Sequence, residues 1–110
     1  MEKDFDTVLL LDIYSGLLTQ KQLRLCDMYY NQDYSLSEIA EIESTTRQAV
    51  RDGIEKAKQK LKSFEESLGI LDKRTRTKSA LEKARLMVQD SRLDEIIDEI
   101  SDIWGNSDGV

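Results

Sequence analysis

Residues 35–51 have the sequence SLSEIAEIESTTRQAVR, and this stretch decides the fold that we expect. Ser35 with Glu38, and Thr45 with Gln48, each show the Ser/Thr-x-x-Glu/Gln spacing of a capping box, which opens a helix. We therefore predict a short helix over 36–42, a tight turn, and a longer helix that begins after Thr45. Two helices joined in this way are typical of a helix-turn-helix, whose second helix can enter the DNA major groove.

The outer side of this second helix carries the side chains that we expect to bind nucleic acid. If Val50 points inward, the arginines on either side of it point outward; arginine donates two hydrogen bonds to guanine, and glutamine pairs with adenine. Hydroxyl groups beside the first amides of a helix suit a phosphate. The candidate residues are Ser44, Thr45, Thr46, Arg47, Gln48, Arg51 and Lys58. Asp52 and Glu55 repel phosphates, so we expect a monomer to bind weakly.

The distribution of charge supports this interpretation better than its sum does. The formal net charge is −6, which is unusual for a nucleic-acid-binding protein. However, residues 44–62 hold six basic and two acidic side chains, and residues 72–92 hold seven and three. The positive charge thus begins where the expected recognition helix begins. The basic side chains of 72–92 are equally well explained as a solvated helix face.

Helical spacing of apolar residues predicts two further helices before this motif, at about 4–17 and 20–31, the second capped by Thr19 with Gln22. In the fourth helix, apolar residues recur every three or four positions from Val50 to Leu71, which is a heptad stripe. We expect its far half to need a partner, either the C-terminal segment or a second copy of the chain. A close helix crossing would explain Gly53 inside this helix, although the sequence alone does not show one.

The rest of the chain reads as an appendage to this domain. Residues 73–78 are polar and basic and predict a connector, followed by a helix at 77–89. Ser91 is expected to cap a last helix at 92–104, and 105–110 to form a flexible tail. We thus expect a helix-turn-helix domain at 1–71 and a helical extension at 72–104.

Catalysis finds little support in the sequence. There is no histidine, and we find neither a glycine-rich phosphate loop nor a Cys/His cluster for a metal, so we expect no enzyme and no cofactor. The acidic pairs Asp94/Asp98 and Glu95/Glu99 have the i, i+4 spacing that can bind a divalent ion, but we interpret them as a solvated face. Cys26 is expected to be a buried apolar residue, and a single cysteine fits the cytoplasm. No apolar run approaches the length of a membrane span, so we expect no membrane contact.

Four segments resemble the YlxM family of small bacterial proteins: LLTQKQ at 17–22, MYYNQDYSLSEIAE at 28–41, TRQAVRD at 46–52 and FEESLG at 64–69. The resemblance covers about residues 5–71. It implies an all-helical fold whose helix-turn-helix is similar to region 4 of sigma factors, which reads the promoter −35 element. It also implies a link to the signal recognition particle, because the genes of this family typically neighbour those of that pathway. The family's helix-turn-helix positions correspond to Ile39, Ala40, Arg47, Gln48, Val50 and Arg51.

The turn departs from the family pattern. The family usually has glycine or asparagine at the turn and an aliphatic residue after it, where this sequence has Ser44 and Thr45. Loss of the aliphatic side chain removes roughly 1.5–3 kcal/mol of potential burial. We therefore expect a looser turn.

Three functions remain open on these grounds. The first is a cytoplasmic DNA-binding regulatory protein of the YlxM type. The second is an accessory protein that binds the RNA or the GTPase of the signal recognition particle, through its basic 72–92 or its acidic 93–108 segment. The third is a helical interaction module, expected as a homodimer through the 50–71 stripe and the apolar face of 93–104.

Overall fold

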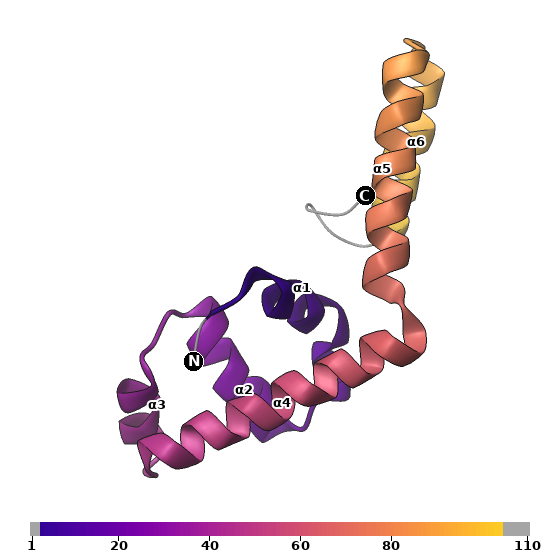
Figure 1. The fold of residues 1–110 in the computed structure, drawn as a ribbon. Helices are drawn as coiled ribbons and strands as arrows, with labels where there is room; N and C mark the ends of the chain where they lie inside the picture. Colours follow the sequence, from indigo (N-terminus) through magenta and orange to yellow (C-terminus); the bar gives the residue numbers. More distant parts are fainter. Residues whose placement is uncertain (1–2, 105–110) are drawn as a thin grey trace. The chain divides into compact units, whose positions relative to one another are not determined.

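The computed structural model describes residues 3–104, and within this range the protein is built of helices alone (Figure 1). This confirms the expected all-α fold. Contacts divide the chain into two compact units, one up to Gly69 and one from Ile70 on. The first unit contains α1 (Phe5–Tyr14), the 3-10 turn η1 (Ser15–Leu17), α2 (Gln20–Cys26), the π-helical turn η2 (Asp27–Asn31), α3 (Leu36–Ile42) and α4 (Arg47–Leu68). The second unit contains α5 (Ile70–Met87) and α6 (Ser91–Ile103).

Two of the three predicted capping boxes are present. Thr19 Oγ1 accepts from the N–H of Gln22 at 3.1 Å, and Gln22 Oε1 accepts from the N–H of Thr19 at 3.1 Å. Ser35 and Glu38 make the equivalent pair of bonds, both at 3.0 Å. These reciprocal bonds satisfy amide groups that the first turn of a helix leaves without partners, so α2 and α3 begin where the sequence indicates.

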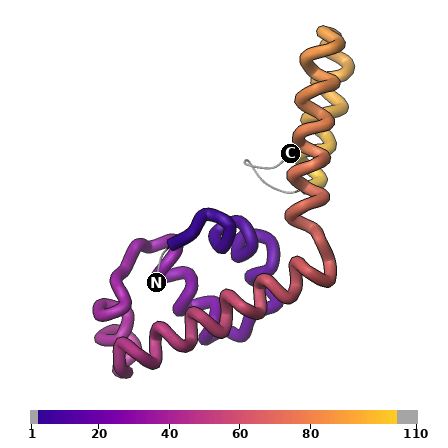
Figure 2. Tube along the Cα trace, viewed as in Figure 1, coloured from indigo at the N-terminus to yellow at the C-terminus, as the bar shows by residue number. Residues whose placement is uncertain are grey.

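Helix α4 is the axis of the first unit, and α1, α2 and α3 all pack along it (Figures 1 and 2). Its inner stripe is fully buried at Val50, Ile54, Ala57 and Leu61. The structure shows a close crossing at Gly53, because a Cβ atom at this position would lie 2.8 Å from Leu25 Cδ1 on α2. Leu36, Ile39 and Ala40 of α3 are buried in the same core.

The far half of α4 finds its partner within the unit. We expected this half to need the C-terminal segment or a second chain; instead α1 covers it. The Tyr14 and Phe64 rings lie 5.9 Å apart between centroids, and Tyr14 Oη donates to Glu65 Oε1 at 2.6 Å. The sequence did not reveal this packing because α1 and the end of α4 are separated by about half of the chain.

The predicted stripe also ends earlier than expected. Gly69 terminates α4 with φ of 62° and donates its N–H to Glu65 O at 2.8 Å, so Leu71 belongs to the next helix. The predicted connector at 73–78 is wrong, since α5 is continuous from Ile70. Lysine and arginine are good helix formers, and Thr77 Oγ1 donates to Lys73 O at 2.7 Å within this segment.

The second unit is a hairpin in which α5 and α6 lie side by side (Figure 2). Its last helix is capped by Asp90, whose Oδ1 accepts from the N–H of Arg92 at 2.9 Å, rather than by Ser91 as predicted. The domain limits that we expected, 1–71 and 72–104, stay predictions, and the expected tail at 105–110 lies outside the described residues. None of the helices within 3–104 has the length and apolarity needed to cross a membrane.

Candidate nucleic-acid interface

Helices α3 and α4 are joined by a turn of four residues that a Schellman motif closes. The N–H of Ser44 donates to Glu41 O at 3.2 Å, and the N–H of Thr45 donates to Ala40 O at 3.0 Å. Ser44 therefore adopts φ of 53°, in the left-handed region where glycine or asparagine is usual. The motif stops α3 and directs the chain into α4.

The start of α4 lies one residue later than the sequence pattern predicts. Thr46 is the N-cap, and its Oγ1 accepts from the N–H of Ala49 at 3.0 Å. The predicted capping box of Thr45 with Gln48 is wrong, because the Schellman motif already uses Thr45 to end α3. This shift makes Arg47 the first and Gln48 the second residue of α4.

The six candidate residues from 44 to 51 lie together and are all exposed to solvent. Arg47 and Arg51 are one helical turn apart, with Val50 fully buried between them. Within residues 3–104, neither guanidinium group forms an ion pair or a hydrogen bond with another residue. Five donor groups on each arginine are thus available for an external acceptor.

Gln48 is partly engaged. Its Nε2 donates to Asp52 Oδ1 at 2.9 Å across one helical turn. The bond orients the amide group, but it also holds a carboxylate beside the exposed arginines. Gln48 can reach a base edge with its remaining donor and its carbonyl oxygen, while Asp52 opposes a nearby phosphate.

Arg24 changes the charge at the turn before α4, a role that the sequence did not indicate. Its Nε on α2 donates to Glu43 Oε1 at the turn, and the two groups form an ion pair. The pair offsets the negative charge of Glu43, which lies three residues before Thr46. No local spacing could reveal it, because the partners are 19 residues apart and only the packing of α2 against α4 brings them together.

Lys58 lies apart from the other candidates. Its side chain is largely covered, and its Nζ lies 3.2 Å from Asp4 Oδ1. Burial works to raise the pKa of Asp4, but the hydrogen bond from Thr7 and the ammonium of Lys58 outweigh it and leave this pKa below its usual value. A nucleic-acid contact by Lys58 stays a prediction, and the lysine has a structural role in holding the start of the chain.

Neither a reactive cysteine nor a metal site is found among residues 3–104. Cys26 is fully buried, and burial raises the pKa of its thiol to about 11, so the reactive thiolate form is disfavoured. Within 3–104, no group of three or more His, Cys, Asp and Glu side chains is placed to hold a metal ion. The exposed start of α4 is therefore the best-defined candidate site in the first unit.

A short helix, a Schellman turn and a long second helix with exposed cations at its start define a helix-turn-helix protein. Comparison with known sequences gives the family. Residues 1–103 match the UPF0122 family, described as "Putative helix-turn-helix protein, YlxM / p13 like", and the chain belongs to this family. The resemblance inferred from the four segments is thereby confirmed.

Relatives in this family cover nearly the whole chain. The protein is 44% identical over 105 residues to a UPF0122 protein of Clostridium perfringens (strain SM101), an alignment that covers 93% of this chain and 92% of the relative. It is 42% identical over 94 residues to one from Oceanobacillus iheyensis, covering 86% and 90%. A UPF0122 protein of Thermoanaerobacter pseudethanolicus is 39% identical over 109 residues, covering 92% and 93%.

Proposed function

We propose that the protein is a DNA-binding regulator of the YlxM type, which places the first turns of α4 in the major groove as region 4 of sigma factors does. One observation carries this proposal: Arg47 and Arg51 are exposed at the start of α4 and have no partner within residues 3–104. Ion pairs with carboxylates of the same chain would have occupied both guanidinium groups. The pairing of Glu43 with Arg24 lowers the repulsion that the turn would exert on a phosphate.

Fluorescence anisotropy on random and selected DNA duplexes tests the proposal. Arg47→Ala and Arg51→Ala are each expected to weaken binding by about 1–3 kcal/mol if the side chain contacts a base, or to lower the salt slope by about 0.9 if it contacts a phosphate. Lys62→Ala is the matched control, because it removes an exposed cation of the same helix about 22 Å from Arg47 and about 16 Å from Arg51.

Two results would reject DNA binding by this surface. Wild-type affinity that does not change with salt concentration excludes phosphate contacts, since these must release counterions. Equal effects of the arginine variants and Lys62→Ala would show that binding depends on general charge and not on the start of α4.

The charge of α5 favours a second function. This helix carries six basic and two acidic side chains, and Lys78 and Lys83 are exposed without ion-pair or hydrogen-bond partners among residues 3–104. We propose as the alternative that the protein is an accessory of the signal recognition particle, the link that membership of the YlxM type implies. The basic α5 would contact its RNA, or the acidic α6 its GTPase.

Separate pull-downs with the RNA and with the GTPase of the particle test this alternative. RNA binding through α5 is expected to weaken in Lys78→Ala and to be unaffected by Arg47→Ala. The opposite pattern would assign the RNA to α4, and absence of both interactions would remove this function.

We also propose that the chain acts as a homodimer in the cytoplasm, where both of these targets lie. The stripe of α4 is not available for this purpose, because α1 already covers it. Large apolar side chains remain exposed on the second unit, among them Met87, Ile96 and Ile103. Sedimentation velocity over a range of protein concentrations measures whether the chain self-associates.

A further inference from the structure

The helical hairpin of the second unit buries few of its apolar side chains. Ile97 is the single buried side chain among its described residues, with 2% of its surface exposed. By contrast Met87, Ile96 and Ile103 are 84%, 53% and 75% exposed. Chains shorter than about 40 residues rarely bury enough apolar surface to be stable alone. The hairpin therefore has both the surface and the need for a further packing partner.

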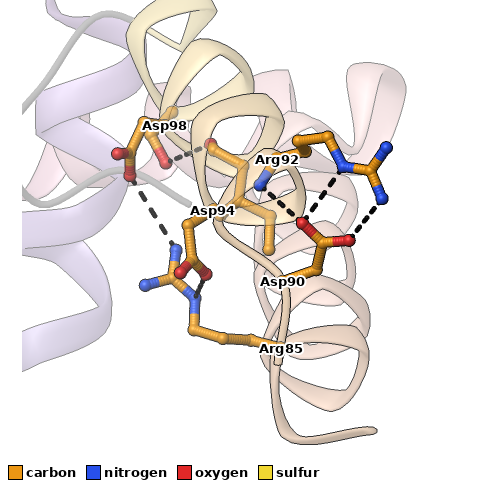
Figure 3. A network of polar contacts seen from close by, with 7 residues as sticks. Arg85, Asp90, Arg92, Asp94 and Asp98 are labelled. Atoms are coloured by element: carbon orange, nitrogen blue, oxygen red, sulfur yellow. Dashed lines mark hydrogen bonds and ion pairs between the residues drawn. The ribbon is translucent and has the colours of Figure 1, made fainter. Parts of the chain in front are cut away.

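An ion-pair network marks one side of the hairpin as polar (Figure 3). Arg85 of α5 reaches across to α6, with Nε 3.8 Å from Asp94 Oδ1 and Nη2 3.9 Å from Asp98 Oδ1. These contacts show which sides of the two helices share one face of the hairpin. The opposite face can then be found from the rotation of about 100° per residue along a helix.

The opposite face is apolar on both helices. On α5, Ala80 and Met87 lie about 140–160° around the helix from Arg85. On α6, Ile96 and Ile103 lie about 140–180° around the helix from Asp94 and Asp98. Four exposed apolar side chains thus gather on the face away from the network, which we name the hairpin face: Ala80, Met87, Ile96 and Ile103.

The charges beside the hairpin face favour pairing of two copies, because one helix of the hairpin is basic and the other is acidic. Helix α5 carries six basic and two acidic residues, whereas α6 carries one basic and five acidic residues. A second copy turned by 180° about an axis parallel to the helices would place its basic α5 over the acidic α6 of the first copy. Stacking α5 on α5 would instead oppose like charges.

We propose that two copies of this chain pair through the hairpin face, with α5 of each copy over α6 of the other, to form an antiparallel four-helix bundle. This rests on the homodimer proposed above and specifies its surface and arrangement. Ala80 leaves room for the isoleucines of the second copy. Lys83 and Glu99, each about 50° from the centre of the face, form the oppositely charged rims.

Two neighbouring residues provide a matched test. Met87 lies on the hairpin face, whereas Leu86, which is 81% exposed, points about 100° away from it. Met87→Asp is expected to raise the dimer dissociation constant in sedimentation equilibrium at least about tenfold, and Leu86→Asp to leave it nearly unchanged. Circular dichroism of both variants checks that the helices are retained.

Charge reversal tests the arrangement by variants that leave the apolar face intact. Lys83→Glu and Glu99→Lys are each expected to weaken the homodimer about fivefold. Each change places like charges opposite one another at positions 83 and 99 on both rims. An equal mixture of the two variants restores both opposite-charge rims, so the heterodimer is expected to regain wild-type affinity.

The outcomes separate this inference from the proposals on which it rests. A wild-type chain that stays monomeric at all concentrations overturns both the homodimer and the hairpin face. A stable dimer that is insensitive to Met87→Asp, or equally sensitive to Leu86→Asp, overturns the hairpin face alone. Loss of DNA binding in Arg47→Ala is measured independently and bears on neither.

Discussion

Ser44 and Arg24 both act at the turn before α4. Ser44 carries the left-handed backbone of the Schellman motif, and Arg24 pairs with Glu43 from another helix. The unusual residue at position 44 can be found by comparison with the family pattern, because it changes a local conformation. The role of Arg24 cannot be found in this way, since no spacing rule connects residues that meet only after α2 packs on α4.

Ser44→Asn is expected to stabilise the protein. Asparagine tolerates a left-handed φ better than serine does, so the free energy of unfolding should rise by about 0.5–1 kcal/mol, measured by urea denaturation. Ser37→Asn is the control, because this exposed position lies within α3, where the two residues have similar helix propensities. A Ser44→Asn variant no more stable than the wild type would show that the turn carries no strain at this position.

At the scale of elements, the crossing of α2 and α4 depends on the missing side chain of Gly53. Glycine within a helix costs about 1 kcal/mol relative to alanine. Here it lets Leu25 approach the α4 backbone, which in turn lets the buried stripe of α4 face α2. The same packing of α2 on α4 brings Arg24 to Glu43 at the turn. The glycine thus costs helix propensity, but it allows the packing that positions Arg24.

Gly53→Ala is expected to destabilise the protein by about 1 kcal/mol, since displacing the packed Leu25 outweighs the gain in helix propensity. In a Leu25→Ala background the same change is expected to be stabilising, because the clashing methyl group is absent. Chemical denaturation of the four members of this cycle measures the coupling.

Gly16→Ala provides the comparison for this cycle, because a Cβ atom there meets nothing within 4 Å. Its effect is expected to be small and independent of Leu25. Additive effects of Gly53→Ala and Leu25→Ala would show that the two residues do not limit the approach of the helices.

At the scale of the whole molecule, three carboxyl groups of the first unit have lowered pKa values in the folded state. Hydrogen bonding and the ammonium of Lys3 lower the pKa of Asp33, and the backbone N–H and hydroxyl of Ser35 lower that of Glu38. Burial works to raise the pKa of Asp4, but Thr7 and Lys58 outweigh it, so this pKa is lowered as well. A carboxyl group with a lower pKa in the folded state than in the unfolded state stabilises the fold above its unfolded pKa.

The protein is therefore expected to lose stability in acid. The contribution of these groups is full near neutral pH and is lost as pH falls from about 5 through the lowered pKa values of the folded state. Urea denaturation at a series of pH values measures this. Asp4→Asn should be less stable than the wild type near neutral pH and should show a shallower loss, and an unfolding free energy that is constant down to about pH 3 would contradict the role of these pairs.

The sequence by itself determined the all-helical fold, two of the helix starts, the inner stripe of α4 and the group of candidate residues from Ser44 to Arg51. These features depend on neighbours within a few positions, where spacing and side-chain chemistry act directly on the backbone. Tertiary structure alone decided that α1 covers the far half of α4, that Arg24 pairs with Glu43, and that Arg85 reaches Asp94 and Asp98 across the hairpin. Each of these depends on which surfaces meet after folding, and residues far apart in the chain determine that meeting through packing and burial, which no local pattern records.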